Sequence, residues 1–403
     1  MTSSDNKSNT FAFSPAACSD AGFAPEPLQE LRMYLQTAVA NGSLPGVVTF
    51  LARGDHVVLH EAIGQGDLAS GRPLRADAQY RLHSMTKPFT AIAMLLLYEE
   101  GKWGFDDPVS AHVPEIHDAL KQPGNRASRE PLLRHLFTHT SGHSFGSTME
   151  EIMDSVARID VFGAGSLVDL VRRYHQLPLR YEPGTRWEYS VGMDLEALIV
   201  ERISGQRYDQ FLQQHVFGPL GMRDTGFALS PAHNEHLVPG YAMDVASRRL
   251  RPANLLEMQD IMFPIGGSSF RSTAGDYARF ARMLLKQGVL GDTRILKPET
   301  GRLMFENLLP DPLLKEQHNS LHYRVGGGNG FSLNGLLCID PAEAGRPVGK
   351  GTYEWAGAHG PWFWADPEHD IVFVGMTNRA MPHAELAPLS LLSQDLVYRA
   401  LKR

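Results

Sequence analysis

The sequence predicts an α+β fold in which one antiparallel sheet is built from both ends of the chain. An amphipathic helix starting near residue 26 precedes two β-rich runs that form a hairpin around Arg53-Gly54-Asp55. Near the other end, two aromatic or β-branched runs are joined by the turn residues 366–370 and followed by a second amphipathic helix. The middle shows mostly helical periodicity. We therefore expect the two terminal helices to cover the sheet and the middle to form an insertion.

Three regions follow from this pattern. Residues 1–25 are small and polar, without the apolar core or basic start of a secretory signal, and are predicted to be a flexible leader. Residues 26–83 and 291–403 are predicted to form one discontinuous α/β domain, and residues 84–290 an inserted, mostly helical domain. A cleft between the two domains is the natural place for a site.

Composition excludes several classes of function. The 403 residues carry 38 Lys and Arg against 45 Asp and Glu, a net charge of -7 without a long basic run, so nucleic acid is not an expected partner. The apolar run at 91–98 is far short of the ~20 residues that cross a bilayer, so no membrane anchor is expected. Two isolated cysteines, Cys18 and Cys338, indicate free thiols and a reducing cytoplasm. The glycine cluster at 325–330 lacks nucleotide-loop spacing, and no cofactor is expected.

The segment GHSFG matches the G-x-S-x-G pattern of a nucleophile elbow at Ser144. That elbow needs a buried strand running into the serine. The residues before Ser144 have helical spacing instead, and Gly142 ends that helix. Ser144 is therefore interpreted as a loop serine near the cleft.

Three histidines in the same region have the spacing of helical metal ligands. His135, His139 and His143 are four residues apart, but Gly142 interrupts the helix and no carboxylate completes the set. Packing or capping histidines are the preferred interpretation, and no metal is expected.

A second serine has better surroundings. Ser84 opens SMTKPFTAIAMLLLYEEGK, the clearest buried helix, and Lys87 lies three residues later, where one helical turn brings it back to the Ser84 hydroxyl. Pro88 lacks an N–H and is tolerated only near a helix start, so the backbone N–H of Ser84 has no partner within the helix. An adjacent base and a free donor are what an acyl-transfer nucleophile needs.

For Lys87 to act as that base, its pKa must fall by roughly three units from ~10.4, which costs about 4 to 5 kcal/mol. Burial and neighbouring positive charge are the expected causes. The alternative for an isolated S-x-x-K is a capping serine and a lysine that extends toward solvent.

Four further segments accompany the S-x-x-K motif at Ser84. They are the LFTHTSG loop, YEPGTRWEYSVGMDLEALIVE from Tyr181, PLGMRDTGF, and WAGAHGPWFWADPEHDIVFVGMTN from Trp355. Together with SMTK they resemble the serine β-lactamase-like superfamily, and most of all the family VIII carboxylesterases, which are related to class C β-lactamases. The resemblance runs in order from about residue 28 to 400. It implies a β-lactamase/transpeptidase-like fold.

The resemblance also implies roles for residues. Ser84 is similar to the nucleophile, Lys87 to its base partner and Tyr189 to a second proton-transfer group. The backbone N–H groups of Ser84 and Ala358 would form the oxyanion hole. LFTHTSG is a structural loop of the family, so GHSFG falls there by accident.

Two departures from β-lactamases bear on the substrate. Val191 stands where those enzymes have Asn, and Trp355-Ala356 where they have Lys-Thr, so the anchors for a β-lactam amide and carboxylate are absent. We expect the substrate-binding residues to be Val191, Trp355, Gly357, His359 and Trp362. Trp355, Trp362 and Phe363 are expected to form an apolar rim. Packing within the sheet is the alternative for the aromatic residues.

The preferred function is hydrolysis of short or medium-chain carboxylic esters, small-molecule substrates, through an acyl-enzyme on Ser84. Three alternatives remain: acyl transfer to a small-molecule or natural-product acceptor, weak β-lactamase or D-peptidase activity, and a non-enzymatic self-assembling role. The sequence leaves the oligomeric state open, a homo-oligomer included.

Overall fold

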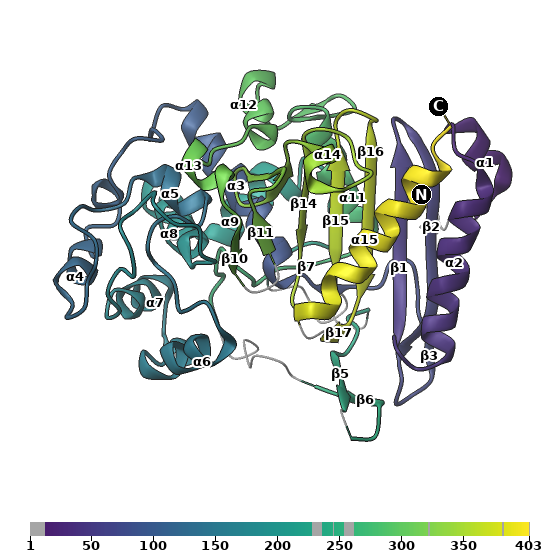
Figure 1. The fold of residues 1–403 in the computed structure, drawn as a ribbon, viewed down its shortest axis with the longest axis horizontal. Coiled ribbons are helices and arrows are strands. Elements are labelled where there is room, and N and C mark those ends of the chain that lie inside the picture. Colours follow the sequence, from purple (N-terminus) through teal and green to yellow (C-terminus); the bar gives the residue numbers. More distant parts are fainter. Residues whose placement is uncertain are drawn as a thin grey trace, which may run out of the picture.

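The protein is described here by a computed structural model. The structure describes residues 13–227, 236–244, 246–253, 262–320, 323–380 and 383–402. In Figure 1 the purple helices near the start of the described chain lie beside the sheet, and the helices between residues 116 and 174 lie at the opposite end of the molecule.

One sheet of eight strands organises the fold. Its order is β12-β13-β14-β15-β16-β1-β2-β3, and every neighbouring pair is antiparallel. The strands are β1 (Gly46–Arg53), β2 (His56–Asp67), β3 (Arg72–Pro73), β12 (Asn329–Phe331), β13 (Leu336–Cys338), β14 (Thr352–Ala356), β15 (Trp362–Asp366) and β16 (Ile371–Thr377). The two chain ends meet where β1 pairs with β16, from Val47 opposite Thr377 to Arg53 opposite Ile371. The predicted α+β fold, with a sheet built from both ends, is confirmed.

Side-chain alternation divides the apolar residues of the sheet between two cores. Successive side chains of a strand point to opposite faces. In β15, Trp362 and Trp364 therefore pack toward the terminal helices, whereas Phe363 and Ala365 pack toward the middle of the chain. Because both faces are covered, β15 and β16 are buried along their whole length.

The two terminal helices cover one face of the sheet. Helix α2 (Pro25–Ala40) packs against α15 (His383–Ala400), and their leucines share a core with Trp364 and Phe373. In Figure 1 these are the purple helix at the edge and the yellow helix across the strands. This arrangement is the one predicted from the two amphipathic patterns.

The leader is ordered further than its polar composition suggests. Ser14 caps α1 (Pro15–Asp20), and Cys18 and Phe23 are completely buried. The backbone N–H of Ala24 donates to the carbonyl of Ala400 at 2.7 Å. The prediction of a flexible leader is therefore wrong for residues 13–25, because the chain end supplies an apolar partner that the sequence does not reveal locally; residues 1–12 lie outside the described part.

The opposite face is covered by α11 (Ala274–Leu285), which packs on β15, β16 and β1. Its buried side includes Tyr277 and Phe280. This helix lies within the predicted insertion 84–290, yet it packs directly on the sheet. An amphipathic pattern does not tell which apolar surface a helix will cover.

The rest of residues 84–290 is mostly helical, with short strands after residue 240. Its centre is α3 (Lys87–Glu99), buried from Lys87 to Leu95 and packed against α8 (Gly192–Ser204). The other helices described there are α4 (Ile116–Lys121), α5 (Leu133–Phe137), α6 (Met149–Arg158), α7 (Leu167–Tyr174) and α9 (Tyr208–Leu212). Beyond residue 290 lie the short helices α12 (Pro298–Arg302), α13 (Asp311–Lys315) and α14 (Pro341–Ala344).

Several short strand pairs tie these parts together. They are β4 (Tyr80–Arg81) with β7 (Arg271–Ser272), β17 (Arg379–Ala380) with β5 (Tyr241–Asp244) and β6 (Arg249–Pro252), β8 (Val289–Leu290) with β9 (Thr293–Arg294), and β10 (His318–Ser320) with β11 (Tyr323–Val325). Among the described helices, none has the length and apolar character to cross a bilayer. Cys18 and Cys338 are buried free thiols, as predicted.

Candidate active site

Ser84 lies where a strand turns into the central helix. It belongs to a 3₁₀ turn, His83–Thr86, that continues directly into α3, and Pro88 is the second residue of that helix. The sequence predicted one regular helix from Ser84 onward, but its first turn is the tighter 3₁₀ form that is common at helix ends. Lys87 still comes back to the serine, with its Nζ 3.0 Å from the Ser84 Oγ.

The amine of Lys87 is held inside the protein by a second contact. The side chain is only 4% exposed, and Nζ donates to the carbonyl of Gly267 at 2.8 Å. Nζ also lies 4.9 Å from the ring centroid of Tyr189. These contacts point the amine at Ser84 and leave it little freedom to turn away.

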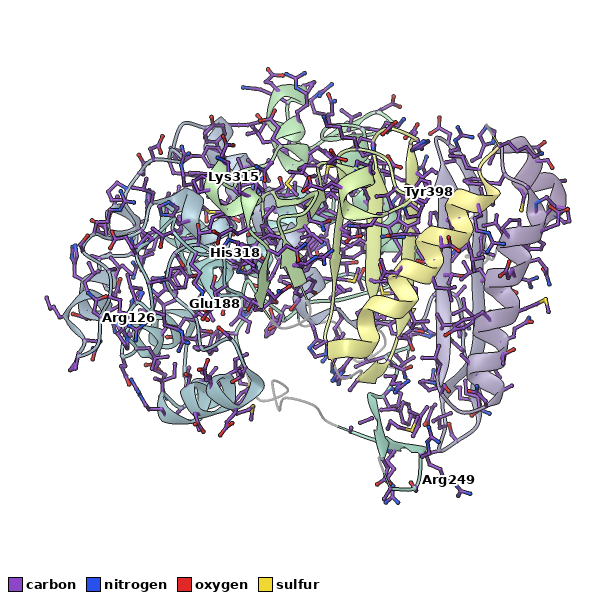
Figure 2. All side chains as sticks on the ribbon, viewed as in Figure 1. Arg126, Glu188, Arg249, Lys315, His318 and Tyr398 are labelled. Atoms are coloured by element: carbon purple, nitrogen blue, oxygen red, sulfur yellow. The ribbon has the colours of Figure 1, made fainter. Side chains whose placement is uncertain are left out.

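Tyr189 completes the constellation from the loop before α8. Its hydroxyl is 2.7 Å from the Oγ of Ser84, and its backbone N–H donates to the Oγ of Ser320 at 3.1 Å. Glu188 and His318, labelled in Figure 2, mark the place where this loop meets β10. The structure thus brings together Ser84, Lys87 and Tyr189, the three residues that the sequence singled out.

The ring of His139 packs against the ring of Tyr189. The two rings stack with centroids 4.7 Å apart and an interplanar angle of 26°, and His139 Nδ1 accepts the N–H of Ser190 at 3.0 Å. Burial and the charge of Lys87 hold the pKa of His139 well below its usual value, so the ring is neutral. The sequence analysis interpreted this residue as a packing or capping histidine of a structural loop and did not connect it with Tyr189.

Three nearly parallel rings form one wall of the site. Trp355 stacks on Tyr323 at 4.1 Å and 9°, and Tyr189 lies 6.1 Å from Trp355 at 6°. Trp355 was expected at this rim, whereas Tyr323 was missed because its short strand has no motif around it. Trp355 is only 2% exposed, so it packs behind the partly exposed rings of Tyr189 and Tyr323, which are the members of the wall that a substrate can reach.

Two predicted rim residues lie elsewhere. Trp362 is buried on the opposite face of the sheet, where its Nε1 donates to Ser393 of α15 at 3.2 Å. Phe363 is on the same face as Trp355 but packs beneath α11 against Tyr277, at 4.8 Å. The prediction fails for both because neighbouring side chains of a strand alternate, and β15 is covered on both sides.

Gly357 brings the end of β14 against the backbone before Ser84. A Cβ at Gly357 would lie 2.2 Å from the carbonyl oxygen of Leu82, so only glycine permits this approach. The next residue is Ala358. Within the described part of the chain, no hydrogen bond uses the backbone N–H of Ser84 or of Ala358, which leaves both donors available for an oxyanion.

The remaining predicted substrate residues are less exposed than expected. His359 is 6% exposed and its ring contacts that of His83 at 4.1 Å. Val191 is half-buried at the start of α8 and lines a small cavity of about 10 Å³ together with His143, Ser144 and Phe145. No hydrogen bond joins either residue to Ser84, and their role in binding a substrate stays a prediction.

The G-x-S-x-G match is a loop, as interpreted from the sequence. Helix α5 precedes it, and the Oγ of Ser144 accepts the N–H of Gly146 at 3.1 Å. His135, His139 and His143 contact different neighbours, and across the described residues no group of three metal-ligating side chains is found.

Two buried carboxylates lie behind Lys87 and were not recognised in the sequence. Asp194 accepts the N–H of Gly267 at 2.7 Å and the hydroxyl of Tyr174 at 2.7 Å. Glu196 accepts from the amide of Asn334 at 2.6 Å. Burial raises the pKa of Asp194 and raises that of Glu196 to about 8. The available signal was the run DLEALIV, in which two acids stand within an otherwise apolar stretch.

Because Asp194 binds the N–H of Gly267 and Lys87 binds its carbonyl, the carboxylate positions the group that positions the amine. Glycine suits this position, since a Cβ would lie 3.0 Å from the carboxylate oxygen of Asp194 and the carboxylate would have to move slightly. A line of contacts therefore runs from Tyr174 through Asp194 and Gly267 to Lys87.

A serine at the start of a buried helix, a lysine one turn later and a tyrosine hydroxyl in contact with the serine define the class of serine β-lactamase-like enzymes. The chain belongs to the Beta-lactamase family, whose model matches residues 31–395. The predicted family and fold are confirmed.

Its relatives include an esterase and an acyltransferase. The chain is 31% identical to esterase EstB of Burkholderia gladioli over 389 residues, covering 90% of this chain and 92% of EstB. It is 26% identical to monacolin J acid methylbutanoyltransferase of Aspergillus terreus over 387 residues, covering 87% of this chain and 90% of that protein. Among solved structures, EstCE1, a hydrolase with promiscuous acyltransferase activity, superimposes with a TM-score of 0.79 at 24% identity, covering 96% of this chain and 100% of EstCE1.

Proposed function

We propose that the protein hydrolyses short or medium-chain carboxylic esters through an acyl-enzyme on Ser84. The observation that carries this proposal is that one oxygen, the Oγ of Ser84, lies within hydrogen-bond distance of both the Lys87 amine and the Tyr189 hydroxyl. Two groups that exchange protons at one nucleophile can serve both halves of an acyl transfer.

In the first half, Ser84 gives its proton to the Lys87–Tyr189 pair as Oγ attacks the ester carbonyl. The oxyanion is stabilised by the N–H groups of Ser84 and Ala358. The tetrahedral intermediate collapses when the carbon–oxygen bond to the alcohol breaks, and the leaving alkoxide takes the proton back from Tyr189. Ser84 then carries the acyl group.

In the second half, water gives a proton to the same pair while its oxygen attacks the acyl carbonyl. The bond to Ser84 breaks, the serine regains its proton, and the carboxylic acid leaves. The partly exposed ring of Tyr323, stacked on the buried Trp355, is an uncharged surface beside this reaction. That favours an apolar group over the charged and amide anchors of a β-lactam.

The test is hydrolysis of p-nitrophenyl butyrate by wild type, Ser84→Ala and Ser144→Ala. We expect Ser84→Ala to lose at least about a thousandfold in kcat/KM, while the control Ser144→Ala stays within roughly twofold. Peptide mapping after a fluorophosphonate should place the label on Ser84. Retained turnover in Ser84→Ala would remove the proposal, and no turnover in wild type would favour a non-enzymatic role.

Acyl transfer is a second candidate, favoured by the similarity to an acyltransferase over most of the chain. It differs only in the group that attacks the acyl-enzyme. Adding increasing methanol or a primary amine during turnover and measuring the ratio of transfer product to acid distinguishes the two. If water and acceptor react without preference, the ratio of transfer product to acid equals the ratio of acceptor to water concentration. A ratio of products far above that value indicates a binding site for the acceptor.

A further inference from the structure

Three nitrogen-bearing side chains adjoin the site without a part in the reaction above. His83 directly precedes Ser84, and His359 directly follows Ala358. Arg81 ends strand β4, three residues before the serine. The chain itself therefore places this group, which we call the Arg81 cluster, beside both the nucleophile and the oxyanion donors.

The two imidazoles of the cluster pack against each other and are almost completely buried. Their centroids are 4.1 Å apart, and the rings are 5% and 6% exposed. Within the described residues, the Nε2 atoms of His83 and His359 have no hydrogen-bond partner. A buried polar atom without a partner is unfavourable, so such atoms often mark a place where another group binds.

The backbone of His83 is also unusual. Its φ is 47°, in the left-handed region that residues with a side chain seldom adopt. This conformation turns the imidazole toward His359 immediately before the serine. Backbone strain of this kind is found where the surrounding structure imposes a functional arrangement.

The guanidinium of Arg81 adds positive charge. Arg81 stands opposite Arg271 in the pair of β4 with β7, and two like charges in this position repel each other. Burial and the charge of Arg271 lower the pKa of Arg81. In the part of the chain that the structure describes, no carboxylate contributes to the pKa shift of Arg81.

The charges that act on the imidazoles have the same sign. Burial and then Arg81 lower the pKa of His359 to about 4. Burial, His359, Arg81 and Lys87 lower the pKa of His83 well below its usual value. Among the described residues, no acidic group contributes to the pKa shift of either imidazole, so the Arg81 cluster offers hydrogen-bond donors in a positive potential.

We propose that the Arg81 cluster binds a carboxylate carried by the ester substrate, so that the preferred substrates are esters of dicarboxylic acids or of carboxylate-bearing alcohols. This inference rests on the proposed function of Ser84. The forked donors of Arg81 match the two oxygens of a carboxylate, and each neutral imidazole can add one N–H. The partly exposed rings of Tyr189 and Tyr323 would contact the apolar remainder of the substrate.

The test compares matched esters that differ by one charge. The mono-p-nitrophenyl ester of adipic acid places the carboxylate on the acyl side, and its methyl ester is the neutral control. 3-Carboxy-4-nitrophenyl butyrate places the carboxylate on the leaving group, with p-nitrophenyl butyrate as control. We expect wild type to prefer the charged member of one pair at least tenfold in kcat/KM after subtraction of the enzyme-free rate.

Variants show whether that preference belongs to Arg81. Arg81→Gln should reduce the ratio of charged to neutral ester at least tenfold, and Arg81→Lys should restore part of it. Arg302→Gln, at an exposed position of α12, controls for general surface charge and should leave the ratio unchanged. A wild-type ratio of one or less in both pairs, or a parallel loss of both members in Arg81→Gln, would overturn the proposal.

Calorimetric titration with adipate requires no turnover, so it distinguishes failure of the anion site from failure of the proposed ester hydrolysis. Wild type that cleaves no ester but binds adipate, with binding at least tenfold weaker in Arg81→Gln, would support the anion site. The same result would contradict the proposed function. If wild type neither prefers a charged ester nor binds adipate, the anion site falls.

Discussion

The hydroxyl of Tyr189 lies 2.7 Å from the Oγ of Ser84 although 105 residues separate them in the chain. A loop bound to Ser320 and a ring stacked on His139 hold the tyrosine in that place. The phenol can therefore pass a proton between the serine and a leaving group without a large movement.

Tyr189→Phe isolates that oxygen. The ring stacking of Tyr189 on His139 survives, whereas the proton-transfer group is lost, so kcat/KM for p-nitrophenyl butyrate should fall by roughly 10² to 10⁴. The melting temperature should change little, which steady-state kinetics and thermal unfolding together would check. A loss of less than about fivefold would assign the proton transfers to Lys87 alone.

Gly357→Ala tests the close approach beside the oxyanion donors. The new methyl group would meet the carbonyl of Leu82 at 2.2 Å and push the N–H of Ala358 away from the reacting carbonyl. We expect kcat to fall by about 10² or more, the range seen on loss of one oxyanion donor. Gly165→Ala, where no atom lies within 4 Å of the added carbon, is the control. Equal activity of the two variants would place the oxyanion hole elsewhere.

Asp194→Asn tests whether the buried carboxylate positions the amine. Asparagine keeps the shape of the side chain but has one oxygen where aspartate has two, so it cannot accept from both the Gly267 N–H and the Tyr174 hydroxyl in the same way. The expected result is a lower kcat for p-nitrophenyl butyrate with little change in KM, because the Gly267 carbonyl that holds the Lys87 amine is displaced. An unchanged kcat in Asp194→Asn would show that this side chain does not position the amine.

Glu196→Gln tests the pH dependence of stability. The pKa of Glu196 is raised from 4.5 to about 8, so the folded protein holds this proton more tightly than the unfolded chain. The contribution to stability is complete below pH 4.5 and is lost as pH rises to about 8, a loss on the order of 5 kcal/mol at 1.36 kcal/mol per pH unit.

Glutamine has no proton to lose, so the variant should gain stability relative to wild type as pH rises from 5 to 9. Urea unfolding of both proteins across that range measures the difference. A difference that does not change with pH would show that Glu196 is ionised in the folded protein or reaches solvent.

Part of the site can be predicted from local sequence patterns. The contact between Ser84 and Lys87 follows from helical geometry, since residues three apart meet on one turn, and Pro88 marks the start of that helix. The run of apolar residues after Lys87 makes the helix buried wherever it packs. The two amphipathic ends and their hairpins likewise predicted the sheet and its terminal helices.

The rest depended on how distant segments meet. Whether Trp355 or Trp362 faces the site is decided by strand pairing and by which helix covers each face, since one step along a strand reverses the side. Tyr189, Asp194 and Arg81 acquire their chemistry from partners far away in the chain. The sequence by itself determined the turn that joins serine and lysine, because hydrogen bonds within one helix are local; only the tertiary structure decided which groups surround that turn, because burial and charge depend on the packing of the whole chain.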